Sequence, residues 1–460
     1  MILGHCCKDG SCLQVCPQHC IRPTPGDPEF AAADHLSIDP GACIGCSACV
    51  DACPVDAIKA EVALTDAERV YIGAQLPASP RAPRPGRPEL PAALSCGRGR
   101  ISVAVVGAGS AAMYTVRELL QRSSAVRVTV FEQSSQLGGL LRTAVAPGHR
   151  GIRRLTRLFD VPFADSRVET CFDTRVGADV TIDALRSRFD AVILAFGAAA
   201  PRAVAGASMP EVHQAIDLLT GAHAVGSGGA PAVAGPTMAI AGGGNVALDV
   251  VTGVARQRIV ARSGAPIARV IVLARAPASR PPFTFSALHE LRQLDVDITV
   301  DTGGHRLDAV APGPLDRLLT ELAQGARPSP RSGLAVEVRF GREVTGLHAA
   351  AGRIRVDTRR ITSGDPGPLA GETAVTADSV VLASGFTCAP LPGVPLGSDG
   401  AVSNRRGRVV VPETGAPIEG LYVVGWAKRG GRGGAGENRR CATETVDMIA
   451  ADLATAPSRA

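Results

Sequence analysis

Cysteines are concentrated at the start of this 460-residue chain, where nine of the thirteen fall within the first 53 positions. Four of them follow the spacing Cys-x2-Cys-x2-Cys-x3-Cys-Pro, which arranges thiolates around a cubane iron–sulfur cluster. These four are Cys43, Cys46, Cys49 and Cys53. A second half-motif, Cys-x3-Cys-Pro, ends with Cys16 and Pro17. In the bacterial two-cluster arrangement the fourth cysteine of each run ligates the other cluster, so the pattern predicts two clusters and electron-transfer chemistry.

The cysteine ligands divide into two sets. The first set combines three thiolates of one loop with a remote fourth, which satisfies a [4Fe–4S] cluster, and consists of Cys16, Cys43, Cys46 and Cys49. The second set consists of Cys6, Cys12 and Cys53. Asp9 stands where the two-cluster spacing places a central thiolate. Because a carboxylate matches iron–sulfur iron poorly, this set favours a [3Fe–4S] cluster, with a second [4Fe–4S] cluster as the alternative.

Zinc binding and disulfide formation are two other uses of clustered cysteines. Paired Cys-x2-Cys runs also suit tetrahedral zinc, but zinc does not explain why both runs end in Cys-Pro. A disulfide scaffold conflicts with an N-terminus that does not resemble a signal peptide, which favours a reducing compartment. Cys7 and Cys20 remain, and we interpret them as small packed thiols beside the clusters.

A dinucleotide-binding pattern begins after residue 100. An apolar strand from Ser102 leads into Gly107-x-Gly109-x-x-Ala112 and a helix, and a second strand, 126–131, ends at Glu132. Glycines at this turn allow the backbone to approach a pyrophosphate, the helix N-terminus faces its charge, and the acid accepts ribose hydroxyls. We therefore expect this unit to bind FAD.

A second copy of the pattern has the opposite charge at its strand end. The turn contains Gly242 and Gly244, Asn245 and Val246 open the following helix, and the strand 268–274 ends at Arg275. An arginine at this place pairs with a 2′-phosphate, so this unit is expected to bind NADP(H).

The remaining segments predict an FAD domain that is split in the sequence. The apolar strands 190–196 and 379–384 look like crossings between the two nucleotide domains. A third strand ends at Gly425 and Trp426, and a glycine-rich run containing Gly436 leads to Asn438 and a helix over 442–453. We predict an α/β fold with two Rossmann-like domains behind a small α+β ferredoxin-like domain. The expected bounds are 1–73 for the cluster domain, 74–100 for a Pro/Arg-rich linker, 101–200 with 377–460 for the FAD domain, and 201–376 for the NADP domain.

With these motifs the chain resembles the adrenodoxin-reductase-like ferredoxin–NADP+ reductases, in the actinobacterial type that carries an N-terminal seven-iron ferredoxin. The resemblance covers essentially the whole chain and includes the segments 6–12, 105–114, 142–147, 244–249, 283–284 and 425–430. It implies that FAD contacts Gly107, Gly109, Glu132, Leu140, Arg142, Trp426 and Asn438, and that NADP contacts Asn245 and Arg275. The chain departs from the family at Ala276, where a second arginine is usual, and at Gly148, where an acid precedes His149.

The sequence thus predicts NADPH-dependent reduction of a flavin that releases electrons singly to iron–sulfur clusters. The acceptor would be the chain's own cluster domain, a separate ferredoxin or another one-electron acceptor, and His149 is the candidate proton-exchanging residue. A disulfide reductase would need a Cys-x-x-Cys pair downstream of residue 100, where the cysteines are isolated. An electron-input subunit of a larger complex, as in glutamate synthase, and a redox sensor stay open as alternatives.

Charge and hydropathy exclude other classes of function. Residues 1–73 hold four Lys/Arg and ten Asp/Glu, a net charge of −6, so the rest carries +11 of the chain's total of +5. An acidic module and a basic body attract each other. The sequence has no basic stripe interleaved with aromatics for nucleic acid and no apolar run of about 20 residues for a membrane span. We expect a cytoplasmic protein.

Overall fold

The computed structural model describes most of the chain. The described residues are 1–30, 33, 35–66, 68, 69, 72, 93, 94, 99–146, 160–223, 231–262, 266–294, 296–304, 307, 314–325, 333–361 and 373–455. Most of the linker expected over 74–100 lies outside this set, as does His149.

The N-terminal module repeats one local structure twice. Helices α1 (Ser11–Val15) and α2 (Ala48–Ala52) each begin after a residue with positive φ and end at a cysteine in extended conformation, Cys16 or Cys53. A proline follows each of these cysteines, and the residue before a proline is disfavoured in helical conformation, so both helices stop there. The strands β1 (Ile21–Arg22) and β2 (Ser37–Ile38) pair antiparallel between the two halves.

The first nucleotide domain is built on a seven-stranded sheet in the order β20-β21-β22-β6-β3-β4-β5. Its strands are β3 (Ile101–Val106), β4 (Val126–Phe131), β5 (Val168–Cys171), β6 (Ala191–Leu194), β20 (Asn404–Arg405), β21 (Arg408–Val410) and β22 (Pro417–Val423). Strands β22 through β5 run parallel. Apolar side chains pack on both faces of this sheet, where α4 (Ser110–Arg122), α7 (Ile182–Arg188) and α13 (Ala435–Thr455) contribute buried residues.

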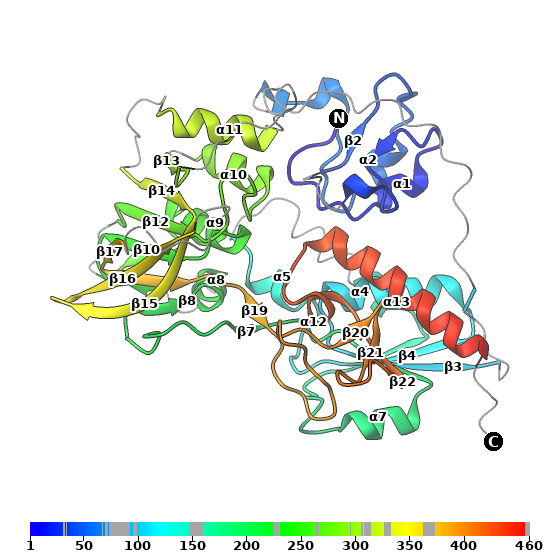
Figure 1. Cartoon of the computed structure of the whole chain (residues 1–460). Coiled ribbons are helices and arrows are strands. Elements are labelled where there is room, and N and C mark those ends of the chain that lie inside the picture. The colour runs from blue at the N-terminus through cyan, green and yellow to red at the C-terminus, as the bar shows by residue number, and fades with distance from the viewer. Residues whose placement is uncertain are drawn as a thin grey trace.

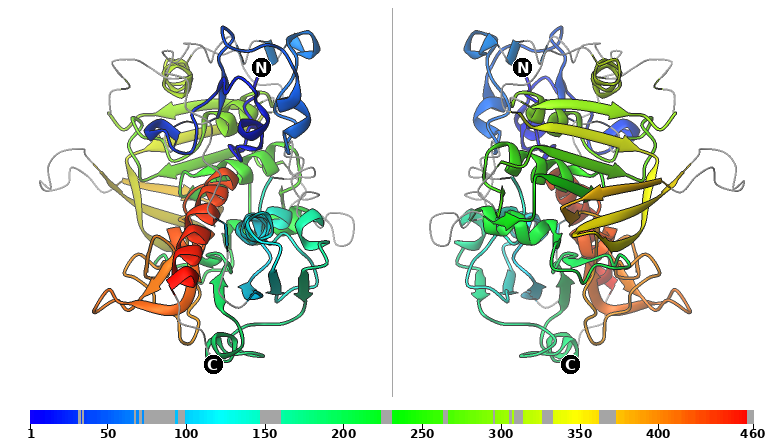
Figure 2. Two further views of the ribbon diagram at one scale, coloured as in Figure 1. Left: turned by 90° about the vertical axis from the view of Figure 1, so that its right-hand side faces the viewer. Right: turned by 90° about the vertical axis from the view of Figure 1, so that its left-hand side faces the viewer.

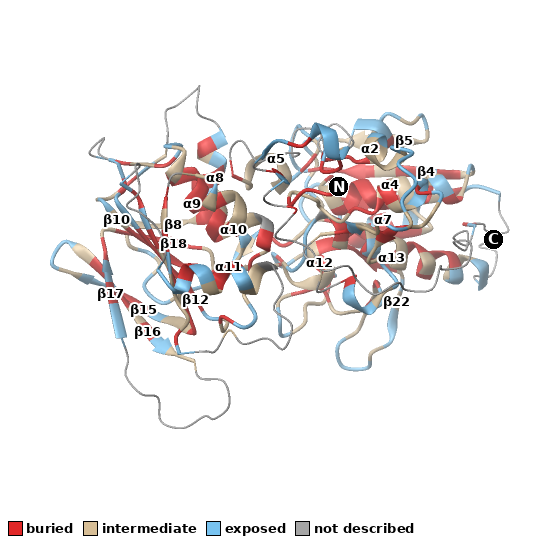
Figure 3. Ribbon diagram, turned by 90° about the horizontal axis from the view of Figure 1, so that it is seen from above, coloured by how far each residue is buried: buried red, intermediate tan, exposed pale blue. Residues whose placement is uncertain are grey.

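The second nucleotide domain has a six-stranded, fully parallel sheet in the order β13-β14-β12-β10-β18-β8. Its strands are β8 (Val212–Gln214), β10 (Thr237–Ala241), β12 (Arg269–Ala274), β13 (Asp297–Asp301), β14 (Ala335–Phe340) and β18 (Ser379–Leu382). Its helices are α8 (Ala215–His223), α9 (Asn245–Ala255), α10 (Phe285–Arg292) and α11 (Pro314–Ala323). The strands β9 (Ala232–Val233) and β11 (Val260–Ala261) pair separately, and an antiparallel sheet of β15 (Arg342–Ala350), β16 (Arg353–Arg360) and β17 (Thr373–Ala377) completes the domain. The two buried cores lie side by side in Figure 3.

The chain passes between the two domains through a short ribbon. Strand β7 (Ala200–Pro201) pairs antiparallel with β19 (Phe386–Thr387), where the chain leaves and re-enters the first domain. The expected return to the first domain at residue 377 is therefore wrong for β18, which pairs with β10 and β8 of the second sheet. A buried apolar run does not reveal which sheet it joins, because either sheet can bury it.

The N-terminal module rests on both nucleotide domains (Figure 1). Leu3, Leu64 and Ile72 belong to the same buried cluster as the helices and strands of the second domain, whereas Leu141 of the first domain packs against the module's own core. Both views in Figure 2 place the module at one end of the molecule, over the two domains. In the part of the chain that the structure describes, no helix is long and apolar enough to cross a membrane.

Candidate functional site

The first glycine-rich turn has the geometry expected for a pyrophosphate site. Gly107 has φ +98°, and a Cβ there would lie 2.8 Å from the carbonyl oxygen of Ala195. Gly109 caps α4 in an extended conformation, and no described atom lies within 4 Å of where its Cβ would be. The N-cap residue of α4 is a glycine and supplies no side-chain cap, so the first amides of the helix lack this hydrogen bond and carry the positive end of the helix dipole. The turn therefore fits an anionic group.

Glu132 directly follows β4 beside this turn, as expected from the sequence, and is buried. Its Oε2 accepts the amide of Ala108 at 2.7 Å, and its Oε1 accepts the amide and hydroxyl of Ser134 at 2.9 and 2.8 Å. A carboxylate has about four lone-pair sites, so Glu132 keeps capacity to accept a ribose hydroxyl. Its position fits the role that we predicted for it.

A second glycine pair covers the same turn. Gly138 donates its amide to the carbonyl of Ala108 at 2.8 Å, and a Cβ on Gly139 would lie 3.2 Å from Gly109 Cα. The short helix α5 (Leu140–Thr143) follows, in which Arg142 Nε donates to the carbonyl of Leu137. Leu140 and Arg142 thus lie on the segment that packs beside the open helix N-terminus.

The C-terminal segment closes on the same helix end. A Cβ on Gly425 would lie 2.4 Å from Ala111 Cβ, and Asn438 Nδ2 donates to Ser110 Oγ at 2.7 Å. Trp426, in α12 (Gly425–Arg429), stacks on Phe386 with ring centroids 5.9 Å apart. The sequence motif at 425–438 is therefore brought to the first glycine-rich turn, although some 300 residues separate them in the chain.

Two of the expected cofactor contacts have different neighbours. Ala112 is a residue of α4 and is fully buried in the core, where a small side chain permits close packing of helix on strand. Gly436 lies in the first turn of α13, which begins at 435 and not at 442 as expected. Its amide donates to the carbonyl of Cys7 at 2.8 Å, so this amide contacts the cysteine module, and the cofactor contact of Gly436 stays a prediction.

The second glycine-rich turn repeats the first. Gly242 has φ +120°, and a Cβ there would lie 2.1 Å from the carbonyl oxygen of Ala383. Gly244 begins α9 without a side-chain cap from any described residue. Asn245 Oδ1 accepts the amide of Thr284 at 2.9 Å, which ties α9 to the start of α10, while Val246 packs against the cores of both domains. This turn also fits an anionic group.

Arg275 follows β12 and extends into solvent. Its side chain is 75% exposed, and its nearest carboxylate oxygen, Glu343 Oε1, is 4.0 Å from Nη1. Glu343 is also bound by Arg359, whose Nε lies 3.0 Å from Oε2. The guanidinium of Arg275 is therefore weakly engaged and available to a phosphate at this end of the sheet.

Two contacts that the sequence did not reveal join the nucleotide domains near α5. The amide of Ala146 donates to Asp249 Oδ1 of α9 at 3.2 Å, and the ring Nε2 of His223 lies 2.5 Å from the carbonyl oxygen of Val145. Val145 and Ala146 precede His149 in the sequence, and the predicted role of His149 lies outside the described residues.

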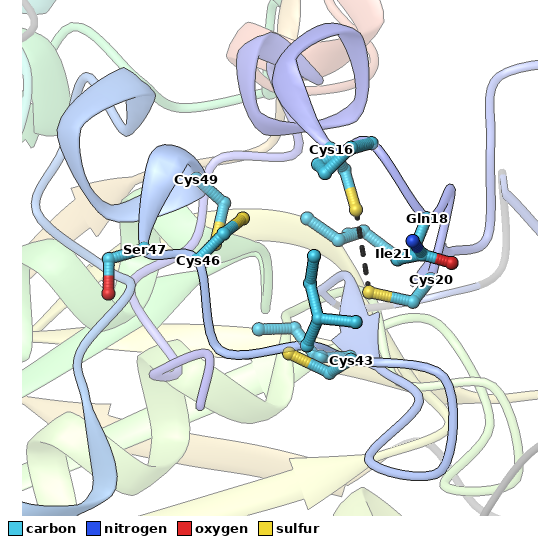
Figure 4. Close-up of a pocket in the computed structure, with 11 residues that line it drawn as sticks. Cys16, Gln18, Cys20, Ile21, Cys43, Cys46, Ser47 and Cys49 are labelled. Carbon is cyan, nitrogen blue, oxygen red and sulfur yellow. Dashed lines mark hydrogen bonds between the residues drawn. The ribbon is translucent and has the colours of Figure 1, made fainter.

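One cysteine site lies near the surface of the module. Its pocket is lined by the four predicted ligands of the [4Fe–4S] cluster, with Ile21, Ile38 and Ile44 around them. Figure 4 shows the sulfur atoms of Cys16, Cys43, Cys46 and Cys49 gathered around this hollow. Cys43 and Cys46 are exposed, and Ile44 between them is 62% exposed. We call this pocket the outer site.

Cys20 also lines the outer site, which agrees with its interpretation as a packed thiol beside a cluster. Its Sγ lies 3.4 Å from Cys16 Sγ, and burial and this neighbour raise its pKa to about 12. In the sequence, the four-residue separation of Cys20 from Cys16 is the signal for this contact, but the two-cluster spacing has no ligand at position 20.

The other set, Cys6, Cys12 and Cys53, forms what we call the inner site. Cys12 and Cys53 are buried, and the three thiols lie close enough for each to influence the ionisation of another. Burial raises the pKa of Cys6 to about 11, so loading with iron must displace its proton. Among the described residues no three His, Cys, Asp or Glu side chains are placed to share a single metal ion. Cluster thiolates bind different iron atoms and need not converge on one point.

Comparisons with known proteins agree with this division. Residues 36–59 match the 4Fe-4S binding domain family, and residues 105–173 match the NAD(P)-binding Rossmann-like domain family. A Mycobacterium tuberculosis protein named "Probable ferredoxin/ferredoxin--NADP reductase" is 33% identical over 490 residues, covering 98% of this chain and 84% of that protein. A Mycobacterium leprae protein of the same name is 30% identical over 98% of this chain. The solved structure of Mycobacterium tuberculosis FprA in complex with NADPH is 27% identical, covers 77% of this chain and 85% of that one, and gives a TM-score of 0.65.

Proposed function

The chain belongs to the ferredoxin/ferredoxin–NADP reductase family, and from this premise we propose that it is an oxidoreductase that passes electrons between NADPH, FAD and iron–sulfur clusters. One observation carries the proposal. Two glycine-flanked helix N-termini without side-chain caps lie in adjacent domains, and a module with two sets of cysteines rests on both of those domains.

Residues of the first domain suit FAD. The open amides of α4 bind the pyrophosphate, Glu132 accepts ribose hydroxyls, and Gly425, Trp426 and Asn438 border the site. When bound, FAD converts a two-electron hydride donor into a one-electron donor. The chain itself would bind and orient the ring, and Trp426, stacked on Phe386, borders the site.

Residues of the second domain suit NADPH. The open amides of α9 bind its pyrophosphate, and the weakly engaged Arg275 pairs with its 2′-phosphate. His149 remains our candidate for proton exchange near the flavin, from its place in the family motif.

The two cysteine sets suit one [4Fe–4S] cluster at the outer site and one [3Fe–4S] cluster at the inner site. The three-iron assignment is supported by the absence of a thiolate at position 9. The exposed edge of the outer site, at Ile44, suits contact with a further one-electron acceptor such as a separate ferredoxin. We place the enzyme in the cytoplasm, where thiols stay reduced.

The proposal is tested with purified protein under anaerobic conditions. We expect bound FAD, a broad iron–sulfur absorbance, and NADPH oxidation coupled to a small dye and to cytochrome c. Protein that binds FAD but does not oxidise NADPH with any acceptor would favour the redox-sensor alternative. Stable copurification of a large partner that is required for turnover would favour an electron-input subunit.

A further inference from the structure

Asp9 stands at the position that would hold a thiolate of the inner site, yet its carboxylate is committed elsewhere. Oδ1 accepts the amide of Ser11 at 3.2 Å, and Oδ2 accepts the hydroxyl of the same serine. The residue is buried, with only 6% of its side chain exposed. A buried carboxylate requires a nearby positive charge or several hydrogen bonds, and part of that compensation comes from outside the module.

The positive charge comes from α13 of the flavin domain. Arg439 Nη1 donates to the backbone carbonyl of Asp9 at 2.5 Å, and it lies 3.8 Å from Asp9 Oδ2 and 3.5 Å from Ser11 Oγ. The arginine side chain is itself 15% exposed. One guanidinium nitrogen thus contacts the loop that precedes α1 at three points.

A second contact lies one turn earlier on the same helix. The amide of Gly436 donates to the carbonyl of Cys7, and a Cβ on this glycine would lie 2.2 Å from the carbonyl oxygen of Lys8. Only glycine permits this approach of the two backbones. Because the first amides of a helix lack intrahelical partners, the Gly436 amide depends on the module for its hydrogen bond.

Apolar packing extends this interface. Leu141 of α5 packs against the module's core and also against Met113, Tyr114 and Ala442 of the flavin domain. The Tyr114 hydroxyl is buried without a hydrogen-bond partner in the described structure. Burial, and next the proximity of Cys7 and Asp9, raise the pKa of Tyr114 well above its usual range. The loop 7–11 therefore contacts α13 directly, and α4 and α5 pack beside it.

We infer that Asp9 and Arg439 are positioning residues that dock the inner site against the flavin domain, which makes the inner site the first of the two to exchange electrons with the flavin. Cys6 and Cys12 of the inner site flank the docked loop in the sequence, whereas Cys43 and Cys46 of the outer site are exposed. Asp9 thus serves the interface and is not an iron ligand. The order of electron transfer rests on the proposed function, but the docking does not.

Hydrogen–deuterium exchange of the cofactor-loaded protein tests the docking without any turnover. Peptides spanning 434–441 report the exchange of the Gly436 amide in α13. Peptides spanning 7–16 report the exchange of the module's loop on the other side of the interface. Arg439→Ala should raise exchange in 434–441 by about tenfold or more, because a hydrogen bond to a charged donor is lost. Asp9→Asn should have a smaller effect, because the backbone carbonyl of residue 9 still accepts the hydrogen bond from Arg439. The double variant should resemble Arg439→Ala alone, since both changes act on one contact.

Arg440→Ala is the matched control. It removes the same charge from the next position of α13, where the side chain is 52% exposed and pairs within the helix with Glu437. It should leave exchange in both segments unchanged. Gly436→Ala is a second perturbation that keeps Arg439, and its added methyl group should raise exchange in 7–16 by pushing the module from α13.

The outcomes separate docking from iron binding and from activity. Asp9→Asn should keep the iron content and the three-iron electron paramagnetic resonance signal, and loss of either would identify Asp9 as a cluster ligand and overturn the inference. Unchanged exchange in Arg439→Ala and Gly436→Ala would overturn it as well. The Arg439→Ala variant should reduce a small dye with NADPH at the normal rate. Electron transfer from its flavin to its clusters should be slower. A wild-type protein with no NADPH oxidation would refute the proposed function while leaving the docking result intact.

Discussion

Coenzyme choice can be tested at Arg275. The substitution Arg275→Ala removes a guanidinium that is 75% exposed and forms a long ion pair, 4.0 Å, with Glu343. Because an exposed ion pair at this distance contributes little to stability, the variant should fold normally. Any effect should therefore appear in the binding of the coenzyme.

The size of the effect follows from the bond that is lost. A hydrogen bond to a charged group contributes about 1.5–3 kcal/mol, which corresponds to roughly ten- to hundred-fold in affinity. Solvent exposure of Arg275 favours the lower end of this range, so we expect about a tenfold rise in KM for NADPH. The KM for NADH, which has no 2′-phosphate, should change little, and kcat should be retained because the contact is equal in ground and transition states.

Steady-state reduction of a small dye with each coenzyme measures these constants. Arg269→Ala is the matched control, because Arg269 begins the same strand, is 51% exposed and pairs with Glu337 at 2.8 Å. It should leave both KM values unchanged. Equal increases for NADPH and NADH in Arg275→Ala would show that Arg275 supports the structure of the domain and does not recognise the phosphate.

Three further predictions use other parts of the molecule. Gly109→Ala should fold normally but lose flavin, because its Cβ meets no described atom and would occupy the space for the pyrophosphate. Gly107→Ala should lower the melting temperature, because its Cβ would approach the Ala195 carbonyl. Measurements of flavin content and of thermal unfolding distinguish the two variants. Iron analysis should give about seven irons per flavin with a three-iron paramagnetic signal, and about eight irons without that signal would refute the three-iron assignment. Burial raises the pKa of Glu68, but Lys59 at 2.8 Å and the amide of Thr65 outweigh this effect and lower the pKa to about 2. The ionised Glu68 therefore stabilises the fold above about pH 4.5, and this contribution is lost as the pH falls toward 2. Glu68→Gln should therefore reduce the free energy of unfolding by about 1–3 kcal/mol at pH 7, and denaturant titrations should show this difference shrinking between pH 5 and pH 3.

The nucleotide turns could be predicted from sequence because their determinants are local. At Gly107 and Gly242 a strand, a tight turn with positive φ and a helix follow one another within about a dozen residues. Glu132 and Arg275 are placed by the end of the next strand. The structure has each of these features at the expected position.

Features that depend on distant partners were not predictable in the same way. Asp9 and Arg439 are 430 positions apart, and neither carries a pattern that identifies the other. The glycine-rich run before α13 suggested a loop, but the helix begins at 435 and Gly436 accommodates the backbone of the docked module. The sheet that β18 joins could not be predicted for a similar reason, because its apolar residues fit either core.

The central claim is that electrons pass within one molecule from NADPH through the flavin site to the chain's own cysteine module. Anaerobic rapid mixing of the full-length protein with NADPH, with freeze-quenched samples for paramagnetic resonance, measures this step directly. The account predicts that flavin reduction is followed by reduction of the clusters at a rate that does not change over a hundredfold range of protein concentration. A cluster reduction rate that rises in proportion to protein concentration, or clusters that stay oxidised while the flavin is reduced, would contradict it.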